Sequence, residues 1–138
     1  MKILFDTNFL ISCVQRRVDF ISESQRLFDT SEIIIPHEVF HELAVISQRE
    51  GKSEDKRAAG LAYQIVQKAQ QNSSISLSKP QSKSADDVLL SFDSDSAVIG
   101  TFDRELKKRF VYASFLRIKG QSLTRIEPRK DLKTHKRR

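Results

Sequence analysis

Near its start the chain reads Lys2-Ile3-Leu4-Phe5-Asp6-Thr7-Asn8, and this stretch sets the type of fold. Three successive apolar residues are stopped by three residues that favour turns and helix caps. The pattern predicts a short buried strand over residues 2–5, followed at once by a helix. A strand that is apolar at successive positions, and not only at alternate ones, indicates a parallel sheet that is covered on both faces.

The same pattern recurs further along the chain. Ile33-Ile34-Ile35 is β-branched throughout and is closed by Pro36, which suits a second buried strand with a helix start directly after it. Residues 97–101 and 114–118 predict two more strands, and 75–77 a short edge strand. Helical periodicity is found at about 8–16, 20–29, 37–49, 54–71, 84–92 and 103–110. Strands that alternate with helices predict an α/β fold around a parallel sheet.

The composition is that of one globular domain. The chain has 138 residues, of which 38% are hydrophobic and 30% charged, and such values exclude disordered and fibrous classes. The longest apolar runs, such as Phe110 to Ala113, have four residues, whereas a membrane-spanning helix needs roughly 20. Asp6 also interrupts any secretory signal at this end. Cys13 has no second cysteine to pair with, so we expect a small core residue in a protein of the reducing cytoplasm, without membrane contact.

The positive charge is concentrated at the C-terminal end. The chain carries 24 Lys and Arg against 18 Asp and Glu, a formal charge of +6. Residues 128–138 hold six of these bases and one acid, which leaves residues 1–127 almost neutral. We expect a domain over 1–127 and a mobile basic tail over 128–138 that attracts RNA by counterion release. A tail that only improves solubility is equally compatible with these charges.

Three acids are expected at one edge of the sheet. In an open parallel sheet the functional crevice lies outside the carboxyl ends of the strands. Asp6 and Asp103 each follow a predicted strand, and Glu42 lies in the helix that follows the second strand. Asn8 and Thr101 are candidates for orienting ligands or water beside these acids. The alternative for Asp6 and Asp103 is a purely structural role as helix caps.

A helical projection separates acids beside apolar stripes from acids on polar faces. Glu42 falls beside apolar positions, which predicts a half-buried carboxylate. Asp86 also projects beside apolar residues. Asp87 projects away from them and forms a capping box with Ser84, so it has a sufficient structural role. We therefore prefer Asp86 to Asp87 as the functional residue of the pair, with Asp87 as the alternative.

A cluster of carboxylates needs cations. If Asp6, Glu42, Asp86 and Asp103 converge, each pair at about 4 Å repels by about 4 kcal/mol at an effective dielectric constant of about 20. Ligation by oxygen alone favours Mg²⁺ or Mn²⁺ over Zn²⁺, and Mg²⁺ is commonly held together with substrate phosphates. Ions bound in this way activate water for phosphodiester hydrolysis. The acids therefore predict a metal-dependent nuclease.

Four segments carry a family resemblance through their order and spacing. They are Asp6-Thr7-Asn8-Phe9-Leu10, Glu42-Leu43, Ala85-Asp86-Asp87 and Thr101-Phe102-Asp103-Arg104-Glu105-Leu106. Over roughly residues 1–120 the chain resembles the PIN-domain ribonucleases. The resemblance implies a three-layer α/β/α fold with a central, mainly parallel sheet, and an endoribonuclease dependent on Mg²⁺ or Mn²⁺. It implies that the metal-binding catalytic acids are Asp6, Glu42, Asp86 and Asp103. One departure is Phe102, where many members carry a polar residue.

The resemblance leaves several biological roles open. The basic residues 104–109 after Asp103 are similar to the branch involved in pre-ribosomal RNA cleavage and to its archaeal relatives. The toxins of toxin–antitoxin pairs share the same core. A module that binds RNA or assists ribosome assembly without cutting is a further alternative, which the presence of all four acids disfavours. The sequence carries no readable signal for a homodimer or for a protein partner such as an antitoxin or a ribosome-assembly factor.

A competing metal motif is His37-Glu38-Val39-Phe40-His41, which matches the H-E-x-x-H signature of zinc metalloproteases. The extended form of that signature requires Gly and His at positions where this chain has Ala44 and Ser47. The other histidine is His135 in the basic tail, so a third ligand would have to be an acid such as Glu54. We rank a zinc protease last and expect both motif histidines to be ordinary residues at a helix start.

Overall fold

The computed structural model describes residues 1–51 and 53–127 and contains one central sheet. Its strands are β1 (Lys2–Phe5), β2 (Glu32–Ile35), β3 (Ser76–Leu77), β4 (Ala97–Gly100), β5 (Ser114–Lys119) and β6 (Ser122–Ile126). They lie in the order β3-β2-β1-β4-β5-β6, with β1 to β5 parallel and β6 antiparallel to β5. The predicted parallel strands are confirmed, but β6 was not predicted. The expected basic tail at 128–138 lies outside the described residues.

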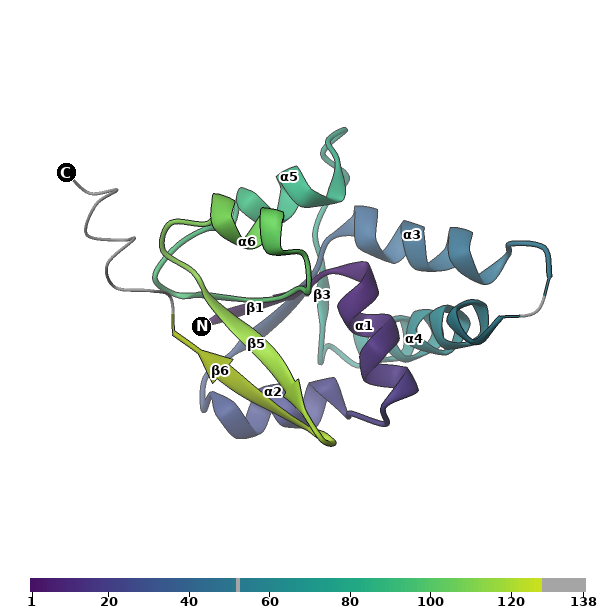
Figure 1. The fold of residues 1–138 in the computed structure, drawn as a ribbon, viewed down its shortest axis with the longest axis horizontal. Coiled ribbons are helices and arrows are strands. Elements are labelled where there is room, and N and C mark those ends of the chain that lie inside the picture. Colours follow the sequence, from purple (N-terminus) through teal and green to yellow (C-terminus); the bar gives the residue numbers. More distant parts are fainter. Residues whose placement is uncertain (52, 128–138) are drawn as a thin grey trace.

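Helices cover both faces of the sheet. They are α1 (Thr7–Gln15), α2 (Phe20–Leu27), α3 (His37–Ser47), α4 (Glu54–Gln71), α5 (Ala85–Leu90) and α6 (Arg104–Arg109). Figure 1 shows α5 and α6 together on one side of the sheet and α2 on the other. Apolar residues of α1 to α4 form one core cluster, and those of α5 and α6 contribute to a second. This arrangement is the expected three-layer α/β/α fold.

The continuous apolar runs of the strands explain the two cores. Successive side chains of a strand point to opposite faces. Ile3 and Phe5 belong to the core under α1 to α4, whereas Leu4 belongs with Ile34 and Ile99 to the core under α5 and α6. Each of these strands therefore has to be apolar at every position, as the sequence indicated.

Most helices end earlier than their periodicity predicted. The helix α4 matches its predicted range of 54–71, but α3 ends at Ser47, α5 at Leu90 and α6 at Arg109. The hydroxyl of Ser47 donates to the carbonyl of Ala44 at 2.7 Å, and such a local bond competes with continuation of the helix. No helix in the described ranges is long and apolar enough to cross a bilayer.

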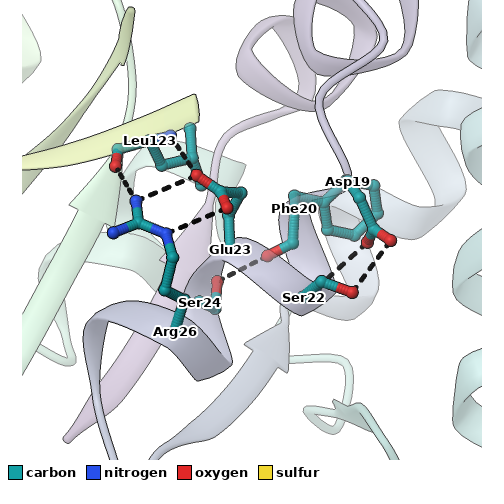
Figure 2. Close-up of polar contacts among 7 residues, drawn as sticks. All are labelled: Asp19, Phe20, Ser22, Glu23, Ser24, Arg26 and Leu123. Carbon is teal, nitrogen blue, oxygen red and sulfur yellow. Dashed lines mark hydrogen bonds and ion pairs between the residues drawn. The ribbon is translucent and has the colours of Figure 1, made fainter. Parts of the chain in front are cut away.

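The helix α2 covers the outer edge of β6 (Figure 2). A carboxylate oxygen of Glu23 accepts a hydrogen bond from the Leu123 amide at 2.8 Å, and Arg26 donates to the Leu123 carbonyl at 2.8 Å. Arg26 and Glu23 also form an ion pair at 3.0 Å. The hydrogen bonds from Arg26 hold the pKa of Glu23 below its usual range, while partial burial acts in the opposite direction. Because side chains of α2 occupy the amide and the carbonyl of Leu123, the second residue of β6, this part of the edge is protected from pairing with another strand.

Cys13 is a core residue, as predicted. Its side chain is fully buried within the cluster formed by α1 to α4. Burial raises the pKa of the Cys13 thiol to about 12. A thiol with so high a pKa carries almost no thiolate at neutral pH and is chemically inert.

Candidate active site

The candidate site lies where the strand order reverses. From β1 the sheet grows through β2 to β3 in one direction and through β4 to β5 in the other. In sheets of this kind, ligands bind in the crevice outside the carboxyl ends of the strands at the reversal. Asp6 directly follows β1, and its amide donates to the Gly100 carbonyl at the end of β4 at 2.8 Å. The Asp6 carboxylate therefore stands at the point where a crevice is expected.

The hydroxyl of Thr101 connects two of the predicted acids. It donates to Asp6 Oδ2 at 3.1 Å and accepts from the amide of Asp103 at 3.1 Å. Thr101 is fully buried, so water does not compete for these bonds. The predicted candidate Thr101 thus orients both acids, whereas Asn8 is exposed and forms no side-chain hydrogen bond with another described residue.

Asp6 and Asp103 also act as helix caps, which was the alternative, purely structural role predicted for them. Asp6 Oδ1 accepts from the Thr7 amide at 2.8 Å at the start of α1. Asp103 Oδ1 accepts from the amides of Glu105 and Leu106 at 3.0 and 3.1 Å at the start of α6. Each carboxylate retains lone pairs, and Oδ2 of Asp103 takes no part in the cap. Capping and ligand binding are therefore compatible at both positions.

The environment of Asp6 disfavours its negative charge. Burial raises the pKa of the Asp6 carboxyl above its usual range, and the negative charges of Asp86 and Glu42 raise this pKa further. The hydrogen bonds from Thr7 and Thr101 act in the opposite direction. Asp86 on α5 and Glu42 on α3 are thus close enough to act on Asp6, although they are far from it in the sequence.

The prediction that Glu42 is half-buried was wrong. Glu42 is exposed, whereas the apolar stripe of α3, consisting of Val39, Leu43 and Ile46, is buried. Val45, one of the apolar positions beside Glu42 on the helical projection, is itself 45% exposed. An apolar neighbour on a helical projection buries an acid only if it faces the core, and Val45 does not.

Asp86 and Asp87 differ as the helical projection predicted. Asp86 is half-buried, and its charge acts on Asp6. Asp87 is exposed, its amide donates to Ser84 Oγ at 3.1 Å, and its carboxylate pairs with Arg109 at 3.2 Å. The expected return bond from Asp87 to the Ser84 amide is replaced by this ion pair. Asp87 therefore joins α5 to α6, and Asp86 is the member of the pair whose charge acts on Asp6.

Both the sequence and the fold of the chain match known proteins. A family model described as a PIN-like domain matches residues 3–119. The chain belongs to this family. The PIN-like domain is 28% identical to ribonuclease VapC4 of Methanocaldococcus jannaschii over 114 residues, which are 80% of this chain and 82% of VapC4. The structure of the PIN domain endonuclease Utp24 matches with a TM-score of 0.67, 17% identity and 92% coverage of both chains. The predicted family and fold are confirmed.

The oxygen donors of this PIN-like domain suit a hard divalent cation. Among residues 1–51 and 53–127, no three His, Cys, Asp or Glu side chains lie close enough together to hold a metal ion, so the structure does not bring three or more of the four acids into one metal-binding group. Mg²⁺ does not require such a group, because one or two carboxylates commonly hold it together with water and substrate phosphates. Asp6, Glu42 and Asp86 form no ion pair with another described residue. Negative charge near Asp6 is therefore left for a cation to offset.

The H-E-x-x-H motif of the PIN-like domain forms the start of α3. Glu38 Oε2 accepts from the Gln81 amide at 2.9 Å, and the His37 amide donates to Ser78 Oγ at 3.3 Å. These bonds attach α3 to the loop between β3 and α5. His41 is exposed. Because no third ligand accompanies the two histidines in the described part of the chain, the geometry gives no support to a zinc protease.

Asp93, which lies between α5 and β4, fixes the turn between α6 and β5. Its carboxylate accepts hydrogen bonds from the amides of Val111, Tyr112 and Ala113 at 2.6, 3.0 and 2.8 Å. Three backbone donors on one carboxylate form a structural anchor, not a catalytic site. No local sequence pattern predicts this role, since the partners lie 18 to 20 residues further along the chain.

Proposed function

We propose that this PIN-like domain is a divalent-metal-dependent endoribonuclease. The observation that carries the proposal is the half-buried Asp6 carboxylate at the strand-order reversal, whose charge is opposed by partial burial and by Asp86 and Glu42. A bound cation would stabilise this arrangement. The names of two similar proteins, a ribonuclease and a PIN domain endonuclease, support the same activity and RNA as the substrate.

The residues of the site have separable tasks in this proposal. When bound, Mg²⁺ or Mn²⁺ supplies an activated water and stabilises charge on the phosphate. Asp6 and Asp86 would hold the ion, and the Thr101 hydroxyl keeps Oδ2 of Asp6 in a fixed position. Asp103 would offer the Oδ2 that takes no part in its cap, and Glu42, whose charge acts on Asp6, would bind the ion or its waters from α3. These four acids are our proposed catalytic and metal-binding residues.

The activity is tested by incubating the full chain with single-stranded and with structured RNA in Mg²⁺, in Mn²⁺ and in EDTA. We expect internal cleavage with either metal and none in EDTA. Cleavage that persists in EDTA would contradict metal dependence. RNA that is bound but never cut would favour the non-catalytic RNA-binding alternative, and zinc-dependent peptide cleavage would favour the protease.

Asp86 and Asp87 form a matched pair for testing the site. Asp87→Ala removes an exposed ion pair with Arg109, so we expect the free energy of unfolding to fall by at most about 1 kcal/mol and cleavage to be retained. Asp86→Asn should eliminate cleavage without lowering stability. Urea unfolding and the RNA assay measure both effects. Equal loss of cleavage in Asp87→Asn and Asp86→Asn would show that Asp87 is the functional acid.

The biological role is a finer part of the same proposal. Enzymes that process ribosomal RNA and toxin-type ribonucleases use the same chemistry, so the proposal includes both roles. It also includes a protein partner, which would be an antitoxin or a ribosome-assembly factor. The division into a domain over 1–127 and an RNA-attracting tail over 128–138 is also kept as a proposal. The cytoplasmic location stays a prediction.

A further inference from the structure

Phe102 is an exposed aromatic side chain on the short segment that carries two residues of the site. It is 46% exposed and lies between Thr101, which is fully buried, and Asp103. Thr101 is hydrogen-bonded to Asp6, and Asp103 caps α6. The backbone on both sides of Phe102 is therefore held in place, between two residues of the proposed site.

Buried aromatic rings support Phe102 from the core. Its ring centroid lies 4.9 Å from that of Phe9, which is fully buried, with an interplanar angle of 31°. Phe9 packs on Phe5 at 5.8 Å, and Phe5 packs on Phe20 at 5.5 Å. A side chain at Gly100 would come within 2.8 to 2.9 Å of the Phe5 and Phe9 rings. A row of four rings thus runs from the core to the surface, and Phe102 is its exposed end.

A single exposed aromatic residue is common on protein surfaces and needs no function by itself. The position of Phe102 is more specific, because the helix that follows it is basic. Residues 104–109 contain four bases and one acid. Arg104 is exposed, and its side chain forms no hydrogen bond or ion pair with another described residue. Its guanidinium is therefore available to a phosphate next to the site.

We propose that Phe102 is a stacking platform for an unpaired RNA base adjacent to the phosphate that is cleaved. The proposal rests on the proposed endoribonuclease function and adds that the substrate is single-stranded at this position. Proteins recognise single strands by stacking their bases on aromatic rings beside a positively charged surface. A base inside a duplex is already stacked on both sides and cannot use the exposed face of Phe102. Stacking tolerates every base, so the platform contributes affinity without reading sequence.

The proposal is tested by fluorescence with the full chain in EDTA, so that the RNA stays intact. The probe is a single-stranded RNA of about ten nucleotides that carries one 2-aminopurine, placed at each position in turn. Anisotropy of an end label measures the Kd, and quenching of 2-aminopurine reports stacking. We expect quenching at one position with the wild-type chain. Phe102→Ala should abolish that quenching and weaken binding by about 5- to 150-fold, which corresponds to about 1–3 kcal/mol per stacked base.

Matched variants separate stacking from general packing. Phe102→Tyr and Phe102→Trp keep a flat ring and should retain both quenching and affinity. Phe102→Leu keeps an apolar contact with Phe9 but has no flat ring, so it should behave like Phe102→Ala. Leu61→Ala removes a side chain of similar exposure, 49%, from α4, a helix that carries none of the proposed acids. It should leave binding and quenching unchanged. Thermal unfolding confirms that each variant is folded.

A double-mutant cycle identifies the partner of Phe102. An abasic nucleotide at the quenched position should weaken binding to the wild-type chain by the same factor as Phe102→Ala weakens binding of the intact RNA. The two changes together should weaken binding no more than either change alone. In Mn²⁺, Phe102→Ala should raise KM for RNA cleavage by a similar factor and change kcat much less. Independent, additive losses in the cycle would overturn the platform.

Failure of the platform and failure of the nuclease give different results. If RNA is cleaved in Mn²⁺ but Phe102→Ala has the wild-type KM and quenching, the platform is wrong and the nuclease stands. If quenching depends on Phe102 but no metal supports cleavage, the nuclease is wrong and the platform stands. If Phe102→Ala binds RNA normally but loses a protein that co-purifies with the wild type, Phe102 is a protein contact and the platform is overturned.

Discussion

Asp6→Asn is expected to reduce metal-stimulated RNA cleavage by about 1,000-fold or more. A bound metal contributes several kcal/mol to stabilisation of the transition state, and about 1.4 kcal/mol corresponds to a tenfold change in rate. The substitution keeps the size of the side chain but removes its charge and one anionic oxygen. Single-turnover cleavage in Mn²⁺ at saturating protein measures this effect separately from RNA binding.

The same substitution is expected to stabilise the metal-free protein. Burial and the charges of Asp86 and Glu42 oppose ionisation of Asp6 in the folded state, and the unfolded chain lacks this penalty. Ionised Asp6 therefore lowers the free energy of unfolding at neutral pH. We expect Asp6→Asn to gain about 1 kcal/mol, the usual scale when a residue selected for function is replaced.

Thermal unfolding in EDTA and in Mn²⁺ checks this prediction. Mn²⁺ should raise the Tm of the wild-type chain, because it binds the folded state, and should have much less effect on Asp6→Asn. Asp29→Asn is a suitable control, since Asp29 is exposed and makes no side-chain hydrogen bond with the described residues. A fully active Asp6→Asn would refute the proposed site, and an Asp6→Asn with a lower Tm in EDTA would show that the carboxylate is mainly structural.

Asp93→Ala is expected to have the largest effect on stability among the acidic residues discussed above. The substitution leaves the amides of Val111, Tyr112 and Ala113 without their acceptor. Hydrogen bonds to a charged group contribute about 1.5–3 kcal/mol each, and water can replace part of this at the exposed Tyr112. We therefore expect the free energy of unfolding to fall by about 2–4 kcal/mol.

Urea unfolding measures this loss as a lower midpoint with an unchanged slope. Asp93→Asn keeps one carbonyl oxygen and should lie between the wild type and Asp93→Ala. Asp29→Ala, which removes an exposed carboxylate of the same size, should stay within about 0.5 kcal/mol of the wild type. If Asp93→Ala were equally mild, the three short hydrogen bonds would not be important for stability.

The strands, the helix stripes and the places of two acids could be predicted from the sequence. The simplest explanation of the runs Ile3-Leu4-Phe5 and Ile33-Ile34-Ile35 is a strand that is buried on both faces. The structure confirms it, since all six residues are buried. The distinction between Asp86 and Asp87 also followed from the sequence. These features depend on residues within one or two turns of each other, and local periodicity encodes such short-range relations well.

Other features depend on segments that meet only in the folded chain. Thr101 bonds to Asp6 across 95 residues, and Glu23 bonds to Leu123 across 100 residues. The strand β6 was missed because only Leu123 of its residues is buried, so it lacks the apolar run of an inner strand. It exists because β5 pairs with it and α2 covers its edge. Glu42 was misplaced for a related reason, since a helical projection orders side chains around a helix but does not show where the core lies.

The amino-acid pattern was thus sufficient for the layers of this PIN-like domain and for the strand ends that carry Asp6 and Asp103. Burial of apolar surface drives both, and it acts on each segment nearly independently. The hydrogen-bond partners of Thr101 and Asp93, the exposure of Glu42 and the ring row that ends at Phe102 were decided by tertiary structure alone. Hydrogen bonds and ring contacts require distances of a few ångströms between particular atoms, and only the complete packing of the chain sets those distances.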